Sequence, residues 1–217
     1  MRLDWRFKRR GAVTLVIDDG PSDVTRQLLA TLQRGGHRAV LFVLGCNVVG
    51  REAILIDAVR RGFALGNHSF DHPRFSGIDL AAARAEIVAT EGLIDAIYLE
   101  ARVPRPGNWF RFPYLDTGEA QFDVLQTLLG ECGFERPAVM EARLAAEDVA
   151  RRDWPTTIAT RDWALPEESE FRAAVRLARP GDIIEFHDKP ETVGRFGRAL
   201  VDELATLSLR AVVPGWD

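Results

Sequence analysis

Residues 12–21 read AVTLVIDDGP, a run of apolar and β-branched residues that ends in two aspartates, a glycine and a proline. Six such residues before a turn signal are typical of a strand that is buried on both faces. Strands of this kind belong to parallel sheets that are covered by helices. The stretch therefore predicts the first strand of an α/β fold, with Asp18 and Asp19 at its carboxyl end.

The rest of the chain repeats this alternation of strand and helix. Strands alternating with helices imply a mainly parallel sheet, and seven or eight such units favour a (β/α)7-8 barrel over an open sheet. We expect a single domain over residues 1–217. Further strands are predicted over residues 38–44, 63–66, 109–112, 137–140, 156–160, 182–186 and 209–213. Helices are predicted over residues 24–33, 51–61, 79–99 (with Asp79 as N-cap), 119–132, 171–178 and 193–207.

Composition limits the partners. The formal net charge of -4 gives no electrostatic case for binding a nucleic acid. No apolar segment is long enough for a membrane span, and no apolar core of a signal peptide follows the basic start, so we expect a cytoplasmic protein. Cys46 and Cys132 lie outside any CxxC pattern; buried free thiols are expected, with a disulfide left open. The oligomeric state is not indicated.

Reactive side chains follow the predicted strands. In a parallel barrel the carboxyl ends of the strands share one face, and active sites are built there. This rule alone gathers residues that are far apart in the sequence into one cleft. They are Asp18, Asp19, His68, His72, Arg111, Tyr114, Asp162 and His187.

Two of the four histidines, His68 and His72, lie four residues apart in the stretch GNHSFDHP. Alone, such a pair is also typical of a solvated surface, and DDGP alone is typical of a turn. Together they offer two imidazoles and a carboxylate, which leave positions open for water and substrate as a catalytic zinc site requires. The same ligands also form the triad of non-haem Fe(II) oxygenases, which stays an alternative.

The remaining polar residues fit acid–base chemistry. One aspartate is placed to take a proton from a water whose pKa a bound metal lowers. Arg111, flanked by aromatic residues in FRFPY, is expected to keep that aspartate ionised. His187 follows an apolar strand, where a histidine is often only a core residue. In this cleft it is placed to protonate a leaving group, with Asp162 orienting it.

The motifs resemble, in order, those of the NodB-homology polysaccharide deacetylases, carbohydrate esterase family 4. The family's TFDDGP, H-[ST]-x-x-H-P, R-x-P-Y, Asp-Trp and L-x-x-H correspond here to VIDDGP (16–21), HSFDHP (68–73), RFPY (111–114), Asp162-Trp163 and IEFH (184–187). Asp153-Trp154 also matches the fourth motif, but Asp162 follows the strand-like TTIAT. The family fold, a distorted (β/α) barrel, agrees with the pattern of strands and helices.

The resemblance implies a role for each matching residue. Asp18 would be the general base, held by Arg111, and the backbone N–H of Tyr114 would stabilise an oxyanion. His187 would be the general acid, tuned by Asp162. Trp163 and Ile184 would border the pocket for the acetyl methyl group. A divalent metal, with Zn²⁺ as the best match and Co²⁺, Ni²⁺ or Mn²⁺ as alternatives, would be bound by Asp19, His68 and His72.

The implied activity is that of a metal-dependent hydrolase that removes N-acetyl groups from amino sugars of a glycan or glycan precursor. Two departures bear on it. Leu115 stands where a glycine often follows the tyrosine, and Glu185 lies in a stretch that is usually apolar. Glu185 is expected either to point out of the barrel or to alter the substrate groove. A non-catalytic glycan-binding relative and a hydrolase of a small non-sugar amide stay open as alternatives.

Overall fold

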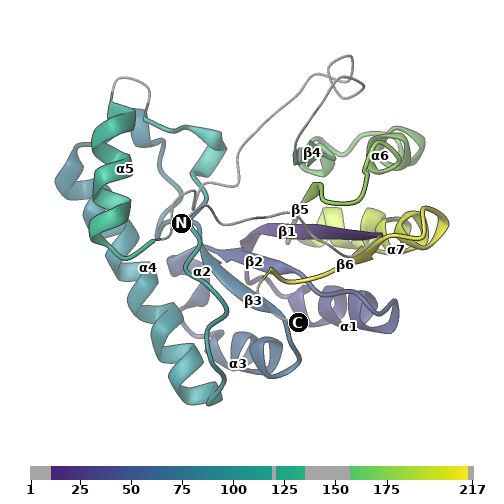
Figure 1. Cartoon of the computed structure of the whole chain (residues 1–217), viewed down its shortest axis with the longest axis horizontal. Coiled ribbons are helices and arrows are strands. Elements are labelled where there is room, and N and C mark those ends of the chain that lie inside the picture. The colour runs from purple at the N-terminus through teal and green to yellow at the C-terminus, as the bar shows by residue number, and fades with distance from the viewer. Residues whose placement is uncertain (1–10, 119–120, 135–156, 215–217) are drawn as a thin grey trace.

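A computed structural model describes residues 11–118, 121–134 and 157–214, and Figure 1 shows its strands and helices alternating along the chain. The strands are β1 (Ala12–Gly20), β2 (Val40–Val43), β3 (Ala64–Asn67), β4 (Thr157–Ala159), β5 (Ile183–His187) and β6 (Arg210–Ala211). The α-helices are α1 (Thr25–Arg34), α2 (Gly45–Val48), α3 (Glu52–Arg60), α4 (Leu80–Ala101), α5 (Phe122–Glu131), α6 (Glu168–Val175) and α7 (Pro190–Thr206). The predicted strand over residues 137–140 lies outside the described residues.

The described strands form one sheet in the order β3-β2-β1-β5-β4, and every pair in it is parallel. β1 lies at the centre, and all nine of its residues are buried, as its sequence predicts. β5 pairs with residues 14–18 of β1. On the other edge of β1, β6 pairs with Ala12 and Val13, and β2 pairs with residues from Val16 onward. The central strand therefore has three neighbours.

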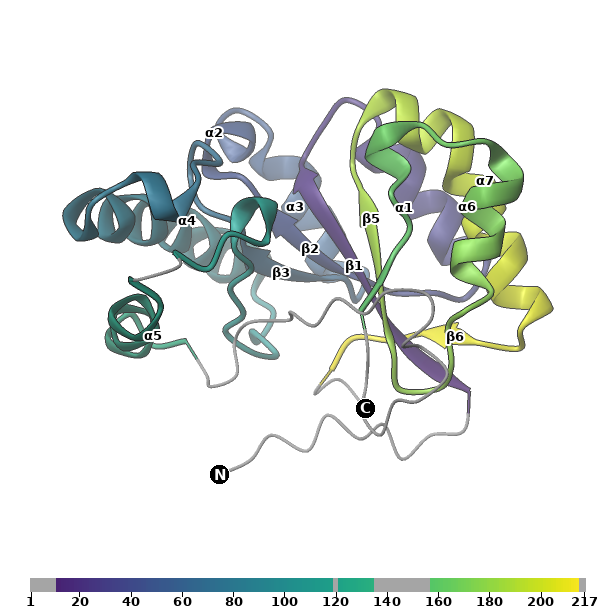
Figure 2. The ribbon, with the colours of Figure 1, turned by 90° about the horizontal axis from the view of Figure 1, so that it is seen from above.

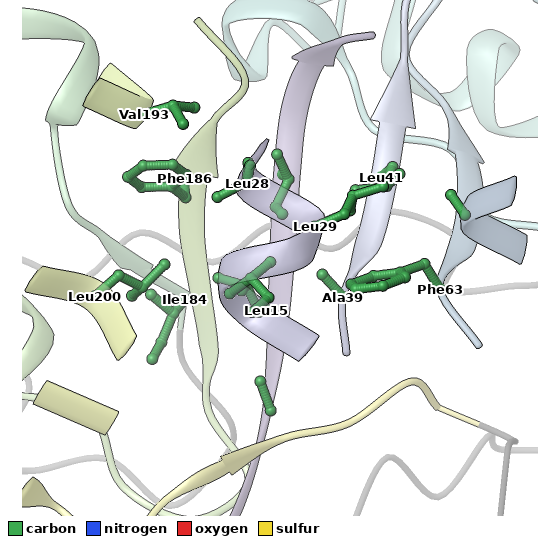
Figure 3. Packing of buried hydrophobic residues seen from close by; sticks show 14 of the residues in the cluster. Leu15, Leu28, Leu29, Ala39, Leu41, Phe63, Ile184, Phe186, Val193 and Leu200 are labelled. Carbon is green, nitrogen blue, oxygen red and sulfur yellow. The ribbon is translucent and has the colours of Figure 1, made fainter. Parts of the chain in front are cut away.

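The outer face of this sheet is apolar and covered by helices. Figure 2 shows α1, α6 and α7 beside β5, with α3 behind β2, and all four helices contribute residues to one buried cluster. Leu15 of β1 and Ile184 and Phe186 of β5 belong to one buried cluster with residues of these helices and of α4, as Figure 3 shows close up. Each fully buried side chain of this size stabilises the fold by about 1.5–3 kcal/mol. This cluster is the main core.

The inner face carries the intervening residues of the same strands, because successive side chains of a strand point to opposite faces. Val16 of β1 packs in a smaller cluster with Phe42 of β2 and Trp109. Asp18, two residues further along β1, and Glu185 and His187 of β5 share this inner face. The inner face therefore changes from apolar to polar toward the carboxyl ends of the strands.

The strand predicted over residues 109–112 is wrong in extent, since the structure has only a bridge between Asn67 and Phe110 there. The Asn67 N–H donates to the Trp109 carbonyl, and the Arg111 N–H donates to the Asn67 carbonyl. The ladder ends because Pro113 has no N–H to donate, and the chain turns into the 3₁₀ helix η2 (Pro113–Leu115). The segment nevertheless runs beside β3 and brings Arg111 to the sheet edge.

Three smaller predictions can also be compared with the structure. Asp79 is the N-cap of α4, and its side chain accepts a hydrogen bond from the Ala82 N–H, as predicted. Both cysteines are free thiols, but Cys46 is exposed and Cys132 only half-buried, so the expectation of burial is wrong. Cys46 belongs to the short surface helix α2. Among the described helices, none has the length and apolarity to cross a membrane.

Candidate active site

Eight of the predicted site residues line one pocket at the carboxyl ends of the strands. The pocket has a volume of about 480 Å³. It is built from the ends of β1 and β5, the loop after β3, and η2. Asp162 lies directly behind it, hydrogen-bonded to His187. The lining residues that the sequence predicted are Asp18, Asp19, His68, His72, Arg111, Tyr114, Trp163 and His187.

A β-bulge turns Asp19 toward the same pocket as Asp18. In a regular strand these neighbours would point to opposite faces. The pairing of β1 with β2 shifts register between Asp18 and Gly20, and Asp19 has a φ of 70°, the left-handed conformation that few non-glycine residues adopt. Bulges of this kind re-aim side chains at functional sites. Both carboxylates therefore border the pocket.

Asp19, His68 and His72 form a cluster that fits a divalent metal. Asp19 Oδ1 lies 3.5 Å from His68 Nε2 and 3.3 Å from His72 Nε2. The three candidate ligand atoms all lie within 4.8 Å of one another. Nitrogen and oxygen ligands of a tetrahedral zinc ion, at about 2.0–2.2 Å from it, are roughly 3.3 Å apart. The cluster thus has the donor types and the spacing of a zinc site.

The tautomer of His68 and the protonation states of His72 and Asp19 also suit a metal. His68 Nδ1 lies 2.8 Å from the Arg111 carbonyl oxygen and donates to it, which leaves the Nε2 lone pair for a metal. Burial, with the charge of Lys189, lowers the pKa of His72 to about 4. Burial raises the pKa of Asp19, but His68, Lys189 and His187 outweigh it and hold that pKa far below its usual range. His72 is therefore neutral and Asp19 ionised near pH 7.

Lys189 is a cation at this site that the sequence reasoning missed. Its Nζ lies 2.8 Å from Asp19 Oδ2, the carboxylate oxygen other than the one nearest the two histidines. The ammonium thereby leaves Oδ1 for a metal. A signal was available in the sequence, because Lys8 and Lys189 are the only lysines in the chain and Lys189 comes two residues after His187.

Arg111 bridges two buried carboxylates. Its Nε donates to Asp18 Oδ2 over 2.7 Å, and a terminal nitrogen donates to Glu185. All three side chains are less than 5% exposed. Asp18 Oδ1 is buried, and within the described ranges no group donates a hydrogen bond to it. Asp18 is thus held through one oxygen and keeps the other available for a proton.

The side chain of Glu185 points into the pocket, whereas that of Ile184 points away from it. Of the two expectations for Glu185, the inward one holds, since its side chain borders the pocket. Ile184, expected beside the acetyl pocket, is instead fully buried in the outer cluster near Leu200 (Figure 3). The assignment of Ile184 as a substrate-binding residue is therefore wrong. The reason is the strand period of two, which puts Glu185 and His187 on one face and Ile184 on the other.

His187 and Asp162 form a hydrogen-bonded pair at the end of β5. Asp162 begins the 3₁₀ helix η5 (Asp162–Ala164) and is fully buried. Its two oxygens accept from His187 Nδ1 and from the His187 backbone N–H, each over 2.9 Å. Burial alone would lower the pKa of His187, but Asp162, with Asp18 and Asp19, raises it to about 9. His187 is therefore a protonated donor near pH 7.

Tyr114 and Trp163 form the rim of the pocket, with half of each side chain exposed. Tyr114 has a φ of 57°, and its ring lies 4.4 Å from the His72 ring. Within the part of the chain that the structure describes, no group accepts a hydrogen bond from the Tyr114 N–H. Leu115 has a φ of 56°, a conformation that glycine adopts more readily than leucine. This conformation fits the glycine that the sequence comparison expects at this position.

The family assignment follows from comparison with known proteins. The sequence model described as polysaccharide deacetylase matches residues 7–131, more than half of the chain. The chain belongs to this family, the NodB-homology polysaccharide deacetylases of carbohydrate esterase family 4. It is a parallel α/β protein of the family's distorted (β/α) barrel type, so the fold predicted from the sequence is confirmed.

Three relatives illustrate the range of the family. A probable peptidoglycan-N-acetylglucosamine deacetylase of Arthroderma benhamiae is 26% identical over 95% of this chain, which spans only 44% of that protein. A chitooligosaccharide deacetylase of Rhizobium leguminosarum bv. trifolii is 26% identical over 93% of this chain and 84% of that protein. A family 4 carbohydrate esterase from Streptomyces lividans, solved with acetate, superposes with a TM-score of 0.72 at 25% identity, covering 93% and 91% of the two chains.

Proposed function

We propose that this protein is a metal-dependent hydrolase that removes the N-acetyl group from an amino sugar within a glycan. The observation that supports the proposal best is that candidate metal ligands, a candidate base and a candidate acid all border one pocket. The candidate metal cluster shares the pocket with Asp18, a carboxylate with one free oxygen, and with His187, a protonated imidazole that lies opposite Asp18 on the neighbouring strand. Amide hydrolysis needs a base for the attacking water and an acid for the departing nitrogen.

The residues present fit a divalent cation, with Zn²⁺ as the best match to one carboxylate and two imidazoles. Asp19 Oδ1, His68 Nε2 and His72 Nε2 would hold it. When bound, the cation would polarise the amide carbonyl and lower the pKa of a coordinated water. Co²⁺, Ni²⁺ and Mn²⁺ accept the same ligands.

Asp18 is the proposed general base. Its Oδ2 is fixed by Arg111, so the free Oδ1 is the atom that takes a proton from the attacking water. Arg111 is itself fixed by Glu185. The guanidinium holds Asp18 in one orientation through this buried hydrogen bond.

His187 is the proposed general acid. Asp162 occupies Nδ1, so Nε2 is the nitrogen that passes its proton to the amine as the C–N bond breaks. The Tyr114 N–H donates to the oxyanion as negative charge develops on the carbonyl oxygen. Water adds to the acyl carbon, the amine leaves with the proton from His187, and acetate is the second product.

A glycan fits the surroundings of the site better than a small amide. A second pocket of about 440 Å³ shares Asp19, His72, Tyr114 and Lys189 with the first. The candidate metal site is thus bordered by open space on both sides, as a polymeric substrate needs. The names of the relatives point to chitin-like or peptidoglycan sugars.

The cytoplasmic location stays a prediction from the sequence, which fractionation of cells containing the native protein would test.

The experiment is acetate release from a panel of N-acetylated glycans, with purified protein, with and without chelator and added Zn²⁺ or Co²⁺. We expect acetate from at least one glycan, loss of activity with chelator and recovery with metal. Asp18→Asn serves as the inactive control that still binds metal. No acetate from the whole panel by protein shown to hold metal would contradict the proposal and favour a glycan-binding relative.

A further inference from the structure

The loop between the two histidine ligands is held by side chains. Four consecutive backbone N–H groups, those of residues 69–72, all donate to side-chain oxygens. The Ser69 N–H donates to Asn67 Oδ1 over 2.9 Å, and the His72 N–H donates to Ser69 Oγ over 3.2 Å. The two N–H groups between them, of Phe70 and Asp71, both donate to Glu86 Oε2, each over 2.8 Å. Glu86 therefore accepts two of these four hydrogen bonds.

The loop needs such support because its backbone is strained. Ser69 has a φ of 72° and His72 a φ of 61°. Non-glycine residues rarely adopt this left-handed conformation, and they keep it only where the surrounding structure enforces it. His72 is itself a candidate ligand, so the direction of its imidazole depends on this conformation.

The loop contacts two different helices. The Ser69 and Phe70 carbonyls accept from the Gly45 and Cys46 N–H groups at the start of α2, over 3.0 and 3.1 Å. Glu86, which accepts from the Phe70 and Asp71 N–H groups, extends from the second turn of α4. Without Glu86, the loop would keep its contacts with α2 but lose its attachment to α4 through Phe70 and Asp71.

We propose that Glu86 is a positioning residue of the metal centre. By accepting from both N–H groups midway between the ligands, it fixes where His72 lies relative to His68, whose ring centroid is 5.0 Å away. The carboxylate charge strengthens both hydrogen bonds. The proposal rests on the metal site of the proposed function, but it concerns the affinity for the metal and not the reaction.

The test compares metal affinity in wild type, Glu86→Gln and Glu86→Ala, by Zn²⁺ competition with a chromogenic chelator. Loss of a residue that orients a ligand typically weakens metal binding about 10–100-fold, and this is the result expected for Glu86→Ala. In Glu86→Gln the amide oxygen still accepts without the charge, so binding weakens by only about 5-fold. Glu100→Ala, an exposed carboxylate on the same helix, is the matched control and is expected to bind as wild type does.

Thermal unfolding of the metal-free proteins separates positioning from folding. Positioning predicts weaker Zn²⁺ binding by Glu86→Gln while its metal-free midpoint stays close to that of wild type. The proposal is overturned if Glu86→Gln binds Zn²⁺ with wild-type affinity and Glu86→Ala either does the same or fails to fold. If wild type itself binds no Zn²⁺, the metal-dependent function is overturned as well, so the two failures can be told apart.

Discussion

The two faces of the central sheet are made from the same strands but have different roles. On the outer face, Leu15, Ile184 and Phe186 pack against helices in the main core. On the inner face, Asp18, Glu185 and His187 carry charge into a largely buried site. In β5 the two sets alternate residue by residue. The five residues of β5 therefore contribute both to the core and to the pocket, and neighbouring residues belong to different faces.

Substitutions on the two faces affect stability in different ways. An apolar residue on the outer face is replaced at a cost in packing that depends on the volume lost. A charged residue on the inner face leaves a buried partner unsatisfied when it is removed. Arg111 is an extreme case, since it is almost fully buried and binds two carboxylates. Substitutions on the two faces should therefore separate activity from stability.

The largest effect is expected on the inner face, from Asp18→Asn. A general base contributes about 10²–10⁴-fold to the rate, and kcat for deacetylation should fall by that factor. Zn²⁺ should stay bound, because Asp19, His68 and His72 are untouched. Urea unfolding should show a smaller change in stability than the outer-face variant below, because Glu185 still pairs with Arg111. A variant with near wild-type kcat would contradict the role of Asp18.

The outer face is probed by Ile184→Ala. Truncating a fully buried isoleucine costs about 2–5 kcal/mol in the free energy of unfolding, which urea denaturation measures. Because Ile184 does not border the pocket, kcat/KM at a temperature where the variant is folded should stay within about 2-fold of wild type. Unchanged stability with a loss of activity would mean that Ile184 borders the acetyl pocket after all.

A third test concerns the pKa of His187, measured by NMR titration of the metal-free protein. Burial would lower this pKa, but Asp162 raises it to about 9. In Asp162→Asn it should fall toward or below the ordinary value of about 6.5. A raised folded-state pKa stabilises the fold fully below about pH 6.5, and this contribution is lost as the pH rises to about 9. The variant should lack that dependence, and a wild-type His187 that titrates near 6.5 would refute the pairing.

The smallest effect is expected at the rim, from Leu115→Gly. Leu115 has a φ of 56°, where a side chain costs about 1–2 kcal/mol relative to glycine. The gain from relieving this strain is offset by the greater freedom of glycine in the unfolded chain. The free energy of unfolding should therefore change by no more than about 1 kcal/mol, as measured by urea denaturation. A larger loss would show that the leucine side chain itself supports the rim.

The sequence predicted which residues meet in the pocket because each motif follows a strand and parallel strands end on one side. It did not predict how Asp18 and Asp19 both face the pocket, since a bulge depends on the pairing with β2. The error at Ile184 was avoidable, because counting back by two from His187 reaches Glu185. Glu86 could not be found in this way, since its role depends on how α4 packs against loop residues 15 and 16 positions earlier in the chain.

The three neighbours of β1 have a consequence for how the chain is made. Its first residues pair with β6, almost 200 residues later in the sequence. On the ribosome, β1 emerges before the other described strands, and part of one edge must stay without its final partner until β6 has been synthesised. Strand edges exposed in this way invite pairing with other chains. The strand that carries Asp18 and Asp19 is thus also a segment that needs protection during biosynthesis.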